Sequence, residues 1–175
     1  HQYRGIICIK NERYADTGSM FTLYNLREHI SGDFVLLESD LIYDKSGLQV
    51  LINDPDADLI LASGQTFSND EVFIETDSDG YLLNMSKNQA DLKRISAELV
   101  GITKLSRQTF QKMCYFAEEQ FSNCPKLDYE YVLVGVASHN KIRVKKIEEY
   151  VWCEIDDDQH LDRAENIILP KIKEN

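Results

Sequence analysis

Residues 34–40 read FVLLESD, and residues 150–156 read YVWCEID. Each stretch is a short apolar run, typical of a buried strand, and each ends in an aspartate. In open α/β sheets, ligands bind at the carboxyl ends of the strands. Two carboxylates delivered to that edge, Asp40 and Asp156, are suited to hold one Mg²⁺ ion, which favours oxygen ligands and often bridges to substrate phosphates. The two stretches therefore predict phosphate chemistry on a nucleotide.

The composition narrows the class of protein. The length of 175 residues fits one domain, which we expect to span residues 1–175. A net charge of -11 argues against a nucleic-acid partner, because phosphate contacts need Lys and Arg. We expect no membrane partner, since no apolar run approaches the roughly 20 residues that span a bilayer. With no secretory signal and no C-x-x-C pair, we expect reduced thiols in a cytoplasmic protein.

The order of strand and helix patterns predicts a mixed α/β fold. Strands are expected at 5–10, 34–40, 58–63, 72–77, 81–86, 98–105, 142–147 and 150–155. Helices are expected at 19–30, at 47–53, after Ser106 and from about Asp157 onward. Residues 128–137 fit either a helix or a strand. This order predicts a Rossmann-like sheet that is mostly parallel, with antiparallel additions.

Five motifs in this order resemble the sugar-phosphate nucleotidyltransferase family, in particular the small cytidylyltransferases that act on phosphocholine and 2-aminoethylphosphonate. The motifs are NERYADTGSM at 11–20, LLESD at 36–40, DG at 79–80 with MSK at 85–87, DYE at 128–130, and WCEID at 152–156 with LDRA at 161–164. The resemblance covers nearly the whole sequence. It implies a nucleotidyltransferase-like domain that uses CTP and Mg²⁺.

One departure from the family pattern is large. These enzymes open with a glycine-rich loop, L-A-A-G-x-G-x-R, whose backbone N–H groups and arginine hold the nucleotide triphosphate. The sequence contains no G-x-G. We therefore expect an N-terminally incomplete domain that lacks its nucleotide-binding portion, and we expect this piece alone to be inactive.

The implied reaction is attack of a phosphonate or phosphate oxygen on the α-phosphorus of CTP, with release of pyrophosphate. The resemblance makes Asp40 and Asp156 the catalytic and metal-binding residues, with Glu154 as a secondary ligand. A simpler interpretation has Asp40 capping the turn after its strand and Asp156 capping the following helix. We assign the helix cap to Asp157 and the metal to Asp156.

The acceptor needs an anionic and a cationic subsite. The resemblance places the anionic group at the start of a helix, where backbone donors favour anions, and the residues are Thr17, Gly18, Ser19 and Met20. Lys87 is expected to pair with a phosphate. Tyr129 and Glu130 are expected to receive a cationic amine through the ring face and the carboxylate. The alternatives are an ordinary helix cap, a solvated hairpin lysine, and an interior tyrosine beside a surface glutamate.

The sequence thus predicts a cytidylyltransferase that activates a small amine-bearing phosphonate or phosphate, with 2-aminoethylphosphonate preferred. Two alternatives stay open: the acceptor is phosphocholine or a sugar phosphate, or the chain is a non-catalytic module that retains the fold. A homodimer, or fusion to a further catalytic domain, is equally compatible with the sequence.

Overall fold

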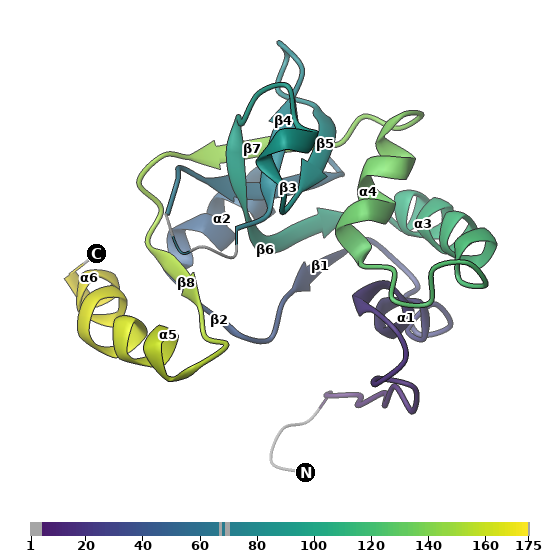
Figure 1. Ribbon diagram of the computed structural model, residues 1–175, viewed down its shortest axis with the longest axis horizontal. Helices are drawn as coiled ribbons and strands as arrows, with labels where there is room; N and C mark the ends of the chain where they lie inside the picture. Colours follow the sequence, from purple (N-terminus) through teal and green to yellow (C-terminus); the bar gives the residue numbers. More distant parts are fainter. Residues whose placement is uncertain (1–4, 67, 69–70, 175) are drawn as a thin grey trace.

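The computed structural model describes residues 5–66, 68 and 71–174, so both ends of the expected domain lie outside the described residues. Figure 1 shows a mixed sheet between α3 and α4 on one side and the ribbon β2–β8 with α5 and α6 on the other. The strands are β1 (Phe34–Leu37), β2 (Leu41–Tyr43), β3 (Leu59–Ser63), β4 (Phe73–Thr76), β5 (Leu82–Ser86), β6 (Ala97–Leu105), β7 (Arg143–Ile147) and β8 (Trp152–Glu154). The helices are α1 (Ser19–Tyr24), α2 (Lys45–Asn53), the short η1 (Gln89–Asp91), α3 (Arg107–Gln120), α4 (Tyr129–Ala137), α5 (Asp158–Arg163), the π-helical η2 (Ala164–Ile168) and α6 (Leu169–Glu174).

The long strand β6 organises the large sheet, whose order is β5-β4-β6-β3-β7 with β1 also paired to β6. One edge of β6 pairs with β3. The other edge pairs with β4 near its start and with β1 near its end. The carboxyl end of β1 therefore faces the amino end of β4 along one edge of β6, and a break in the sheet lies between them.

The expected mixed α/β class is confirmed, and the strand directions refine it. Strands β1, β3, β4 and β7 run in one direction, and β5 and β6 run in the other. Among the described strands, β3 and β7 form the one parallel pair. The other two strands of the same direction, β1 and β4, pair with the reversed strand β6, which separates them from β3. Most strands of the large sheet therefore run in one direction, although most hydrogen-bonded pairs are antiparallel.

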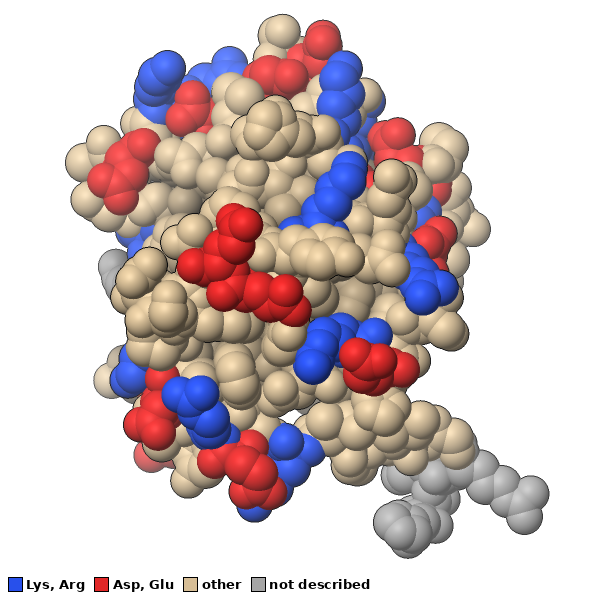
Figure 2. All heavy atoms as spheres, turned by 90° about the vertical axis from the view of Figure 1, so that its right-hand side faces the viewer, with Lys and Arg blue, Asp and Glu red and all other residues tan. Residues whose placement is uncertain are grey.

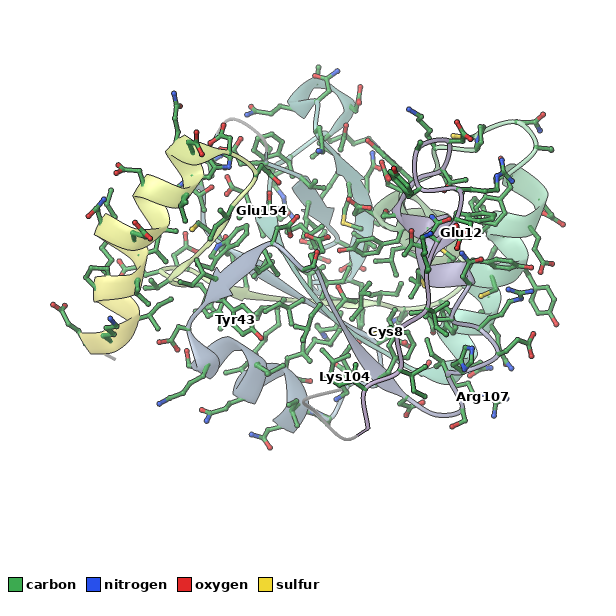
Figure 3. The ribbon with its side chains drawn as sticks, turned by 90° about the horizontal axis from the view of Figure 1, so that it is seen from below. Cys8, Glu12, Tyr43, Lys104, Arg107 and Glu154 are labelled. Carbon is green, nitrogen blue, oxygen red and sulfur yellow. The ribbon has the colours of Figure 1, made fainter. Side chains whose placement is uncertain are left out.

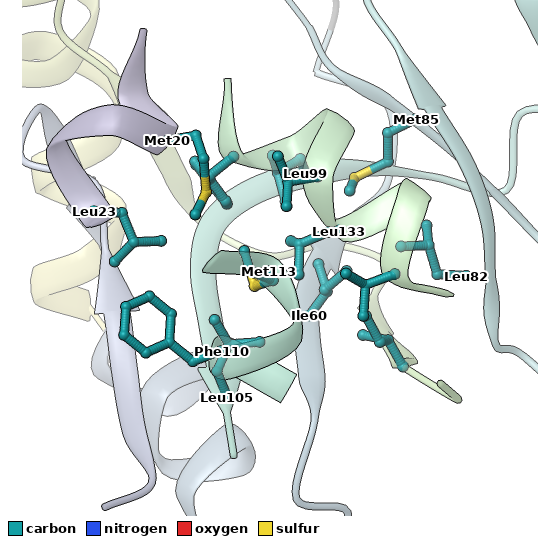
Figure 4. Packing of buried hydrophobic residues seen from close by; sticks show 14 of the residues in the cluster. Met20, Leu23, Ile60, Leu82, Met85, Leu99, Leu105, Phe110, Met113 and Leu133 are labelled. Carbon is teal, nitrogen blue, oxygen red and sulfur yellow. The ribbon is translucent and has the colours of Figure 1, made fainter. Parts of the chain in front are cut away.

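The main core lies between the large sheet and the helices α1, α3 and α4. Figure 4 shows Phe110 and Met113 of α3 close to Leu133 of α4 and Ile60 of β3. Ser106 begins α3 as predicted, since its side chain accepts a hydrogen bond from the Thr109 amide at 3.1 Å. The opposite face of the sheet packs on α2 and the ring of Tyr150 in a second cluster of buried side chains.

Two expected elements differ in the structure. Residues 5–10 form no strand, and Ile6 and Ile7 are 64% and 71% exposed. An apolar run becomes a strand only where a neighbouring strand takes its backbone hydrogen bonds, and among the described residues none does so here. The helix expected over 19–30 ends at Tyr24 and continues as turns to His29. Residues 128–137, ambiguous in the sequence, contain the helix α4.

The ribbon β2–β8 was not expected as a unit, because β2 is too short to stand out in the sequence. Leu41 pairs with Glu154, and Tyr43 pairs with Trp152. The pairing continues past the ribbon, where the Ile155 amide donates to the Asp40 carbonyl at 2.9 Å. The C-terminal helices cover the outer side of the ribbon through a small cluster of buried side chains. None of the described helices could span a bilayer.

Candidate active site

A cavity of about 590 Å³ opens at the break in the sheet between β1 and β4. The ends of β5 and β8 and the first turns of α1 and α4 complete its wall. Its ionisable lining residues are Glu38, Asp40, Lys87, Asp128, Tyr129, Glu130, Glu154 and Asp156. Among the described residues of the lining, six carboxyl groups thus face one lysine, so the cavity is suited to cations and to anions that arrive with a counterion.

The two predicted aspartates line this same cavity, although they are far apart in the sequence. Asp40 follows β1 and precedes β2, and Asp156 follows β8, so the β2–β8 pairing draws both to the seam between the sheet and the ribbon. Both side chains are exposed to solvent. Glu154 also lines the cavity, and Figure 3 shows it between the C-terminal helices and the α1 side of the molecule. The metal role of these residues stays a prediction.

The carboxylates fit a magnesium ion in kind, though they form no complete cage. Among the described residues, no three His, Cys, Asp or Glu side chains are grouped closely enough to hold a metal ion. Mg²⁺ commonly keeps several waters and takes one or two protein carboxylates together with substrate phosphates. Asp40 and Asp156 are carboxylates of that kind, and Glu154 lines the same cavity.

Glu38 is a cavity residue that the sequence analysis did not single out. The Tyr129 hydroxyl donates a hydrogen bond to Glu38 Oε1 at 2.5 Å. On its other side the carboxyl lies against Gly101, whose φ of +79° favours glycine and where a Cβ atom would collide with Glu38 Oε2. Burial raises the pKa of Glu38, against the lowering effect of the Tyr129 bond. Strand alternation could have found it, because Glu38 and Asp40 lie two residues apart.

Tyr129 and Glu130, the predicted amine subsite, sit in different surroundings. Tyr129 is 3% exposed, and burial raises its pKa well above the ordinary value, with a further contribution from Glu38. Glu130 is half-buried, and mainly through burial its pKa is raised to about 7. Glu130 Oε2 is buried and has no hydrogen-bond partner among the described residues. Of the two, Glu130 therefore has the acceptor atom that needs a donor.

The predicted anion segment mainly joins α1 to α4. The Ser19 amide and hydroxyl both donate to Asp128 Oδ1, at 3.1 and 3.2 Å, and the Ser19 hydroxyl accepts from the Tyr129 amide. Met20 is fully buried in the core. The remaining two residues, Thr17 and Gly18, do not line the cavity, whereas Ser19 does.

The Asp128 carboxylate already accepts the hydrogen bonds from Ser19 that an anionic ligand would use. The anion-binding role of the segment from Thr17 to Met20 stays a prediction. Lys87, by contrast, is exposed and lines the cavity directly after β5. Lys87 is the basic side chain among the described residues of the lining, which keeps the expected phosphate contact open.

One side of the outer surface carries charges of both signs. Figure 2 shows the side of the molecule that carries α1, α3 and α4, where acidic and basic side chains alternate over short distances. Such a surface lacks the continuous basic stripe that phosphate backbones require. The cavity at the seam is the more distinctive feature.

No family model matches the sequence. The structure is similar to the inositol-1-phosphate CTP transferase from T. maritima, with a TM-score of 0.77, 16% sequence identity, and coverage of 97% of this chain and 67% of that one. It is similar to the CTP:phosphocholine cytidylyltransferase from Streptococcus pneumoniae, with a TM-score of 0.73, 17% identity, and coverage of 93% and 69%.

A third similar structure is that of a glucose-1-phosphate thymidylyltransferase from Bacillus anthracis, with a TM-score of 0.69, 12% identity, and coverage of 90% and 62%. The chain therefore has the fold of the nucleotidyltransferases. At these identities the likeness shows the fold alone, and the chain spans about two thirds of the first two structures and less of the third.

Proposed function

We propose that this chain is part of a magnesium-dependent nucleotidyltransferase that transfers a cytidylyl group from CTP to a small amine-bearing phosphonate or phosphate. The observation that carries the proposal is the presence of Asp40 and Asp156 at one cavity in a nucleotidyltransferase fold. The preference for CTP is supported by the two similar structures whose names include CTP.

In the proposed reaction an oxygen of the acceptor attacks the α-phosphorus of CTP, and the bond to the pyrophosphate leaving group breaks. Such reactions depend on positioning and charge neutralisation more than on a protein nucleophile. Asp40 and Asp156 would hold Mg²⁺, which when bound supplies a Lewis acid for the phosphate oxygens. Lys87 offers a further positive charge to a phosphate at the same cavity.

The lining of the cavity favours an acceptor with a positive charge. The described part of the lining has six carboxyl groups and one lysine, which would repel an acceptor that is only anionic. A primary ammonium brings three N–H donors, whereas a trimethylammonium brings none and needs an aromatic cage. Tyr129 is the aromatic residue in the described lining, and its ring is buried. These features favour 2-aminoethylphosphonate over phosphocholine.

The test is pyrophosphate release by the full-length protein. CTP, UTP, dTTP and ATP are each paired with 2-aminoethylphosphonate, phosphocholine and glucose-1-phosphate, with Mg²⁺ and with a chelator. We expect the highest kcat/KM for CTP with 2-aminoethylphosphonate, and no release after chelation. Release that is fastest with another pair would correct the substrates. No release with any pair would favour the non-catalytic alternative.

Glu130 offers a test of the amine subsite. Glu130→Gln keeps the size of the side chain and removes its charge, so binding of a primary amine should weaken by roughly 1.5–3 kcal/mol, the scale of a hydrogen bond to a charged group. Kinetics with 2-aminoethylphosphonate and phosphocholine would measure it. If the variant changes neither acceptor, the assignment of Glu130 is wrong.

A further inference from the structure

The Glu38 carboxyl is held in place from two sides. Tyr129 donates its hydroxyl to Oε1 at 2.5 Å, and the absence of a Cβ at Gly101 leaves room for Oε2. The Glu38 amide also donates to the Gly101 carbonyl at 3.0 Å, which fixes the backbone that carries the side chain. A carboxylate has about four acceptor positions, so one bond from Tyr129 leaves Glu38 able to accept more. This is a prepared acceptor group facing the cavity.

Glu130 presents a second acceptor to the same cavity. Its Oε2 atom is buried and lacks a hydrogen-bond partner among the described residues, a state that costs free energy until a donor arrives. Glu38 and Glu130 line the same cavity, and Glu38 is hydrogen-bonded to Tyr129, the residue directly before Glu130. The described ion pairs include none between Lys87 and either glutamate.

We propose that Glu38 and Glu130 together bind the ammonium group of the acceptor, and that Tyr129 is a positioning residue that holds Glu38 through its hydroxyl. The proposal rests on the proposed function and changes the role expected for Tyr129, whose buried ring has no need to contact the amine. Three N–H donors of a primary ammonium match two carboxylates that approach from different elements, the end of β1 and the start of α4. Glu38 then determines which acceptor is used.

The experiment compares two acceptors that differ in one group, 2-aminoethylphosphonate and 2-hydroxyethylphosphonate, in the full-length protein. Glu38→Gln should lower the preference for the amine, measured as the ratio of kcat/KM values, by on the order of tenfold or more. Tyr129→Phe should lower it less, through a higher KM for the amine. Tyr131→Phe makes the same change on an exposed side chain of the same helix, and it should leave the ratio unchanged.

Calorimetric titration of both acceptors, with no nucleotide present, tests the subsite without turnover. The wild type should bind the amine more tightly, and Glu38→Gln should reduce that difference even if the protein transfers no nucleotide. Equal binding of the two acceptors by the wild type would overturn the proposal. So would an equal loss of kcat/KM for both acceptors in Glu38→Gln and Tyr129→Phe, because that pattern would place Glu38 in the shared chemistry. If Glu38→Gln fails to fold, the ratio in Tyr129→Phe decides.

Discussion

The large sheet and the ribbon β2–β8 differ in how they are held. All five residues of β3 are buried, with clusters of apolar side chains on both faces of the sheet. The ribbon has two strands of three residues, and every residue of β2 is only half-buried. Asp40 lies where the chain passes from the large sheet to the ribbon, and Asp156 follows the ribbon strand β8. The structure thus separates the part that supplies most of the stability from the seam that presents the carboxylates.

The largest expected effect is on turnover, at the seam. Asp40→Asn in the full-length protein should lower kcat by on the order of 10²-fold or more, as does removal of one preorganised charge stabiliser in other enzymes. Folding should be intact, because the side chain is exposed. Steady-state kinetics and thermal melting would measure the two properties.

Asp158→Asn is the matched control, since Asp158 is also exposed and lies two residues beyond Asp156 outside the cavity lining. Its kcat should be close to that of the wild type. Activity of Asp40→Asn within a few-fold of wild type, with normal Mg²⁺ dependence, would argue against Asp40 as a ligand.

The next effect contrasts the two regions directly. Ile60→Ala opens a cavity in the core, where the side chain is fully buried, and should lower the free energy of unfolding by about 3 kcal/mol. Ile42→Ala, at a half-buried position of β2, should lower the free energy of unfolding by about 1–2 kcal/mol, because folding removes less apolar surface from water at this position. Urea denaturation would measure both.

Activity should rank these two variants in the opposite order. At a temperature where both are folded, Ile42→Ala should lower kcat more, because the ribbon positions Asp40 and Glu154. Equal costs in stability, or a larger loss of kcat in Ile60→Ala, would show that the two regions are not separated in this way.

A third prediction concerns pH and Glu130. Because folding raises the pKa of this carboxyl to about 7, its contribution to stability is complete below its unfolded pKa and is lost as the pH rises through 7. Glu130→Gln should therefore become more stable relative to wild type between about pH 4.5 and pH 7, by at most about 3 kcal/mol.

Denaturation across this pH range, without metal or ligand, would measure the difference. The charges of Glu38 and Asp128 also raise the pKa of Glu130, and the charge of Lys87 lowers it. Glu149→Gln, at an exposed position, is the control. A difference that does not change with pH would mean that Glu130 is not held in a raised-pKa environment.

The smallest effect separates two neighbouring aspartates. Asp157 accepts a hydrogen bond from the His160 amide at 2.8 Å and caps α5, as the sequence predicted. Asp157→Ala should make the first turn of α5 exchange its amide hydrogens faster and leave kcat nearly unchanged. Asp156→Asn should lower kcat and leave the amide exchange of the first turn of α5 nearly unchanged. Hydrogen exchange and kinetics on both variants would check this, and a severe loss of activity in Asp157→Ala would reverse the assignment.

Much of the fold was accessible from the sequence, because most elements follow local rules. Apolar runs marked β3 and β6, helical spacing marked α3, and Ser106 and Asp157 marked two helix starts. The expected strand at 5–10 failed for a non-local reason, since strand formation depends on a partner that hydrophobicity does not reveal. The ribbon was missed for a different reason, because β2 has three residues, too few to show the alternation of apolar and polar side chains that predicts a strand.

The sequence by itself determined the fold class and the two strands that precede Asp40 and Asp156, since these are encoded in short contiguous stretches, although β1 ends at Leu37 and Asp40 lies in the turn that follows. Only the tertiary structure placed Glu38 beside Tyr129, which is 91 residues away in the sequence, and left Glu130 Oε2 buried without a hydrogen-bond partner among the described residues. The physical reason is that burial and hydrogen bonding across the chain depend on how the elements pack. No local pattern in the sequence records that packing.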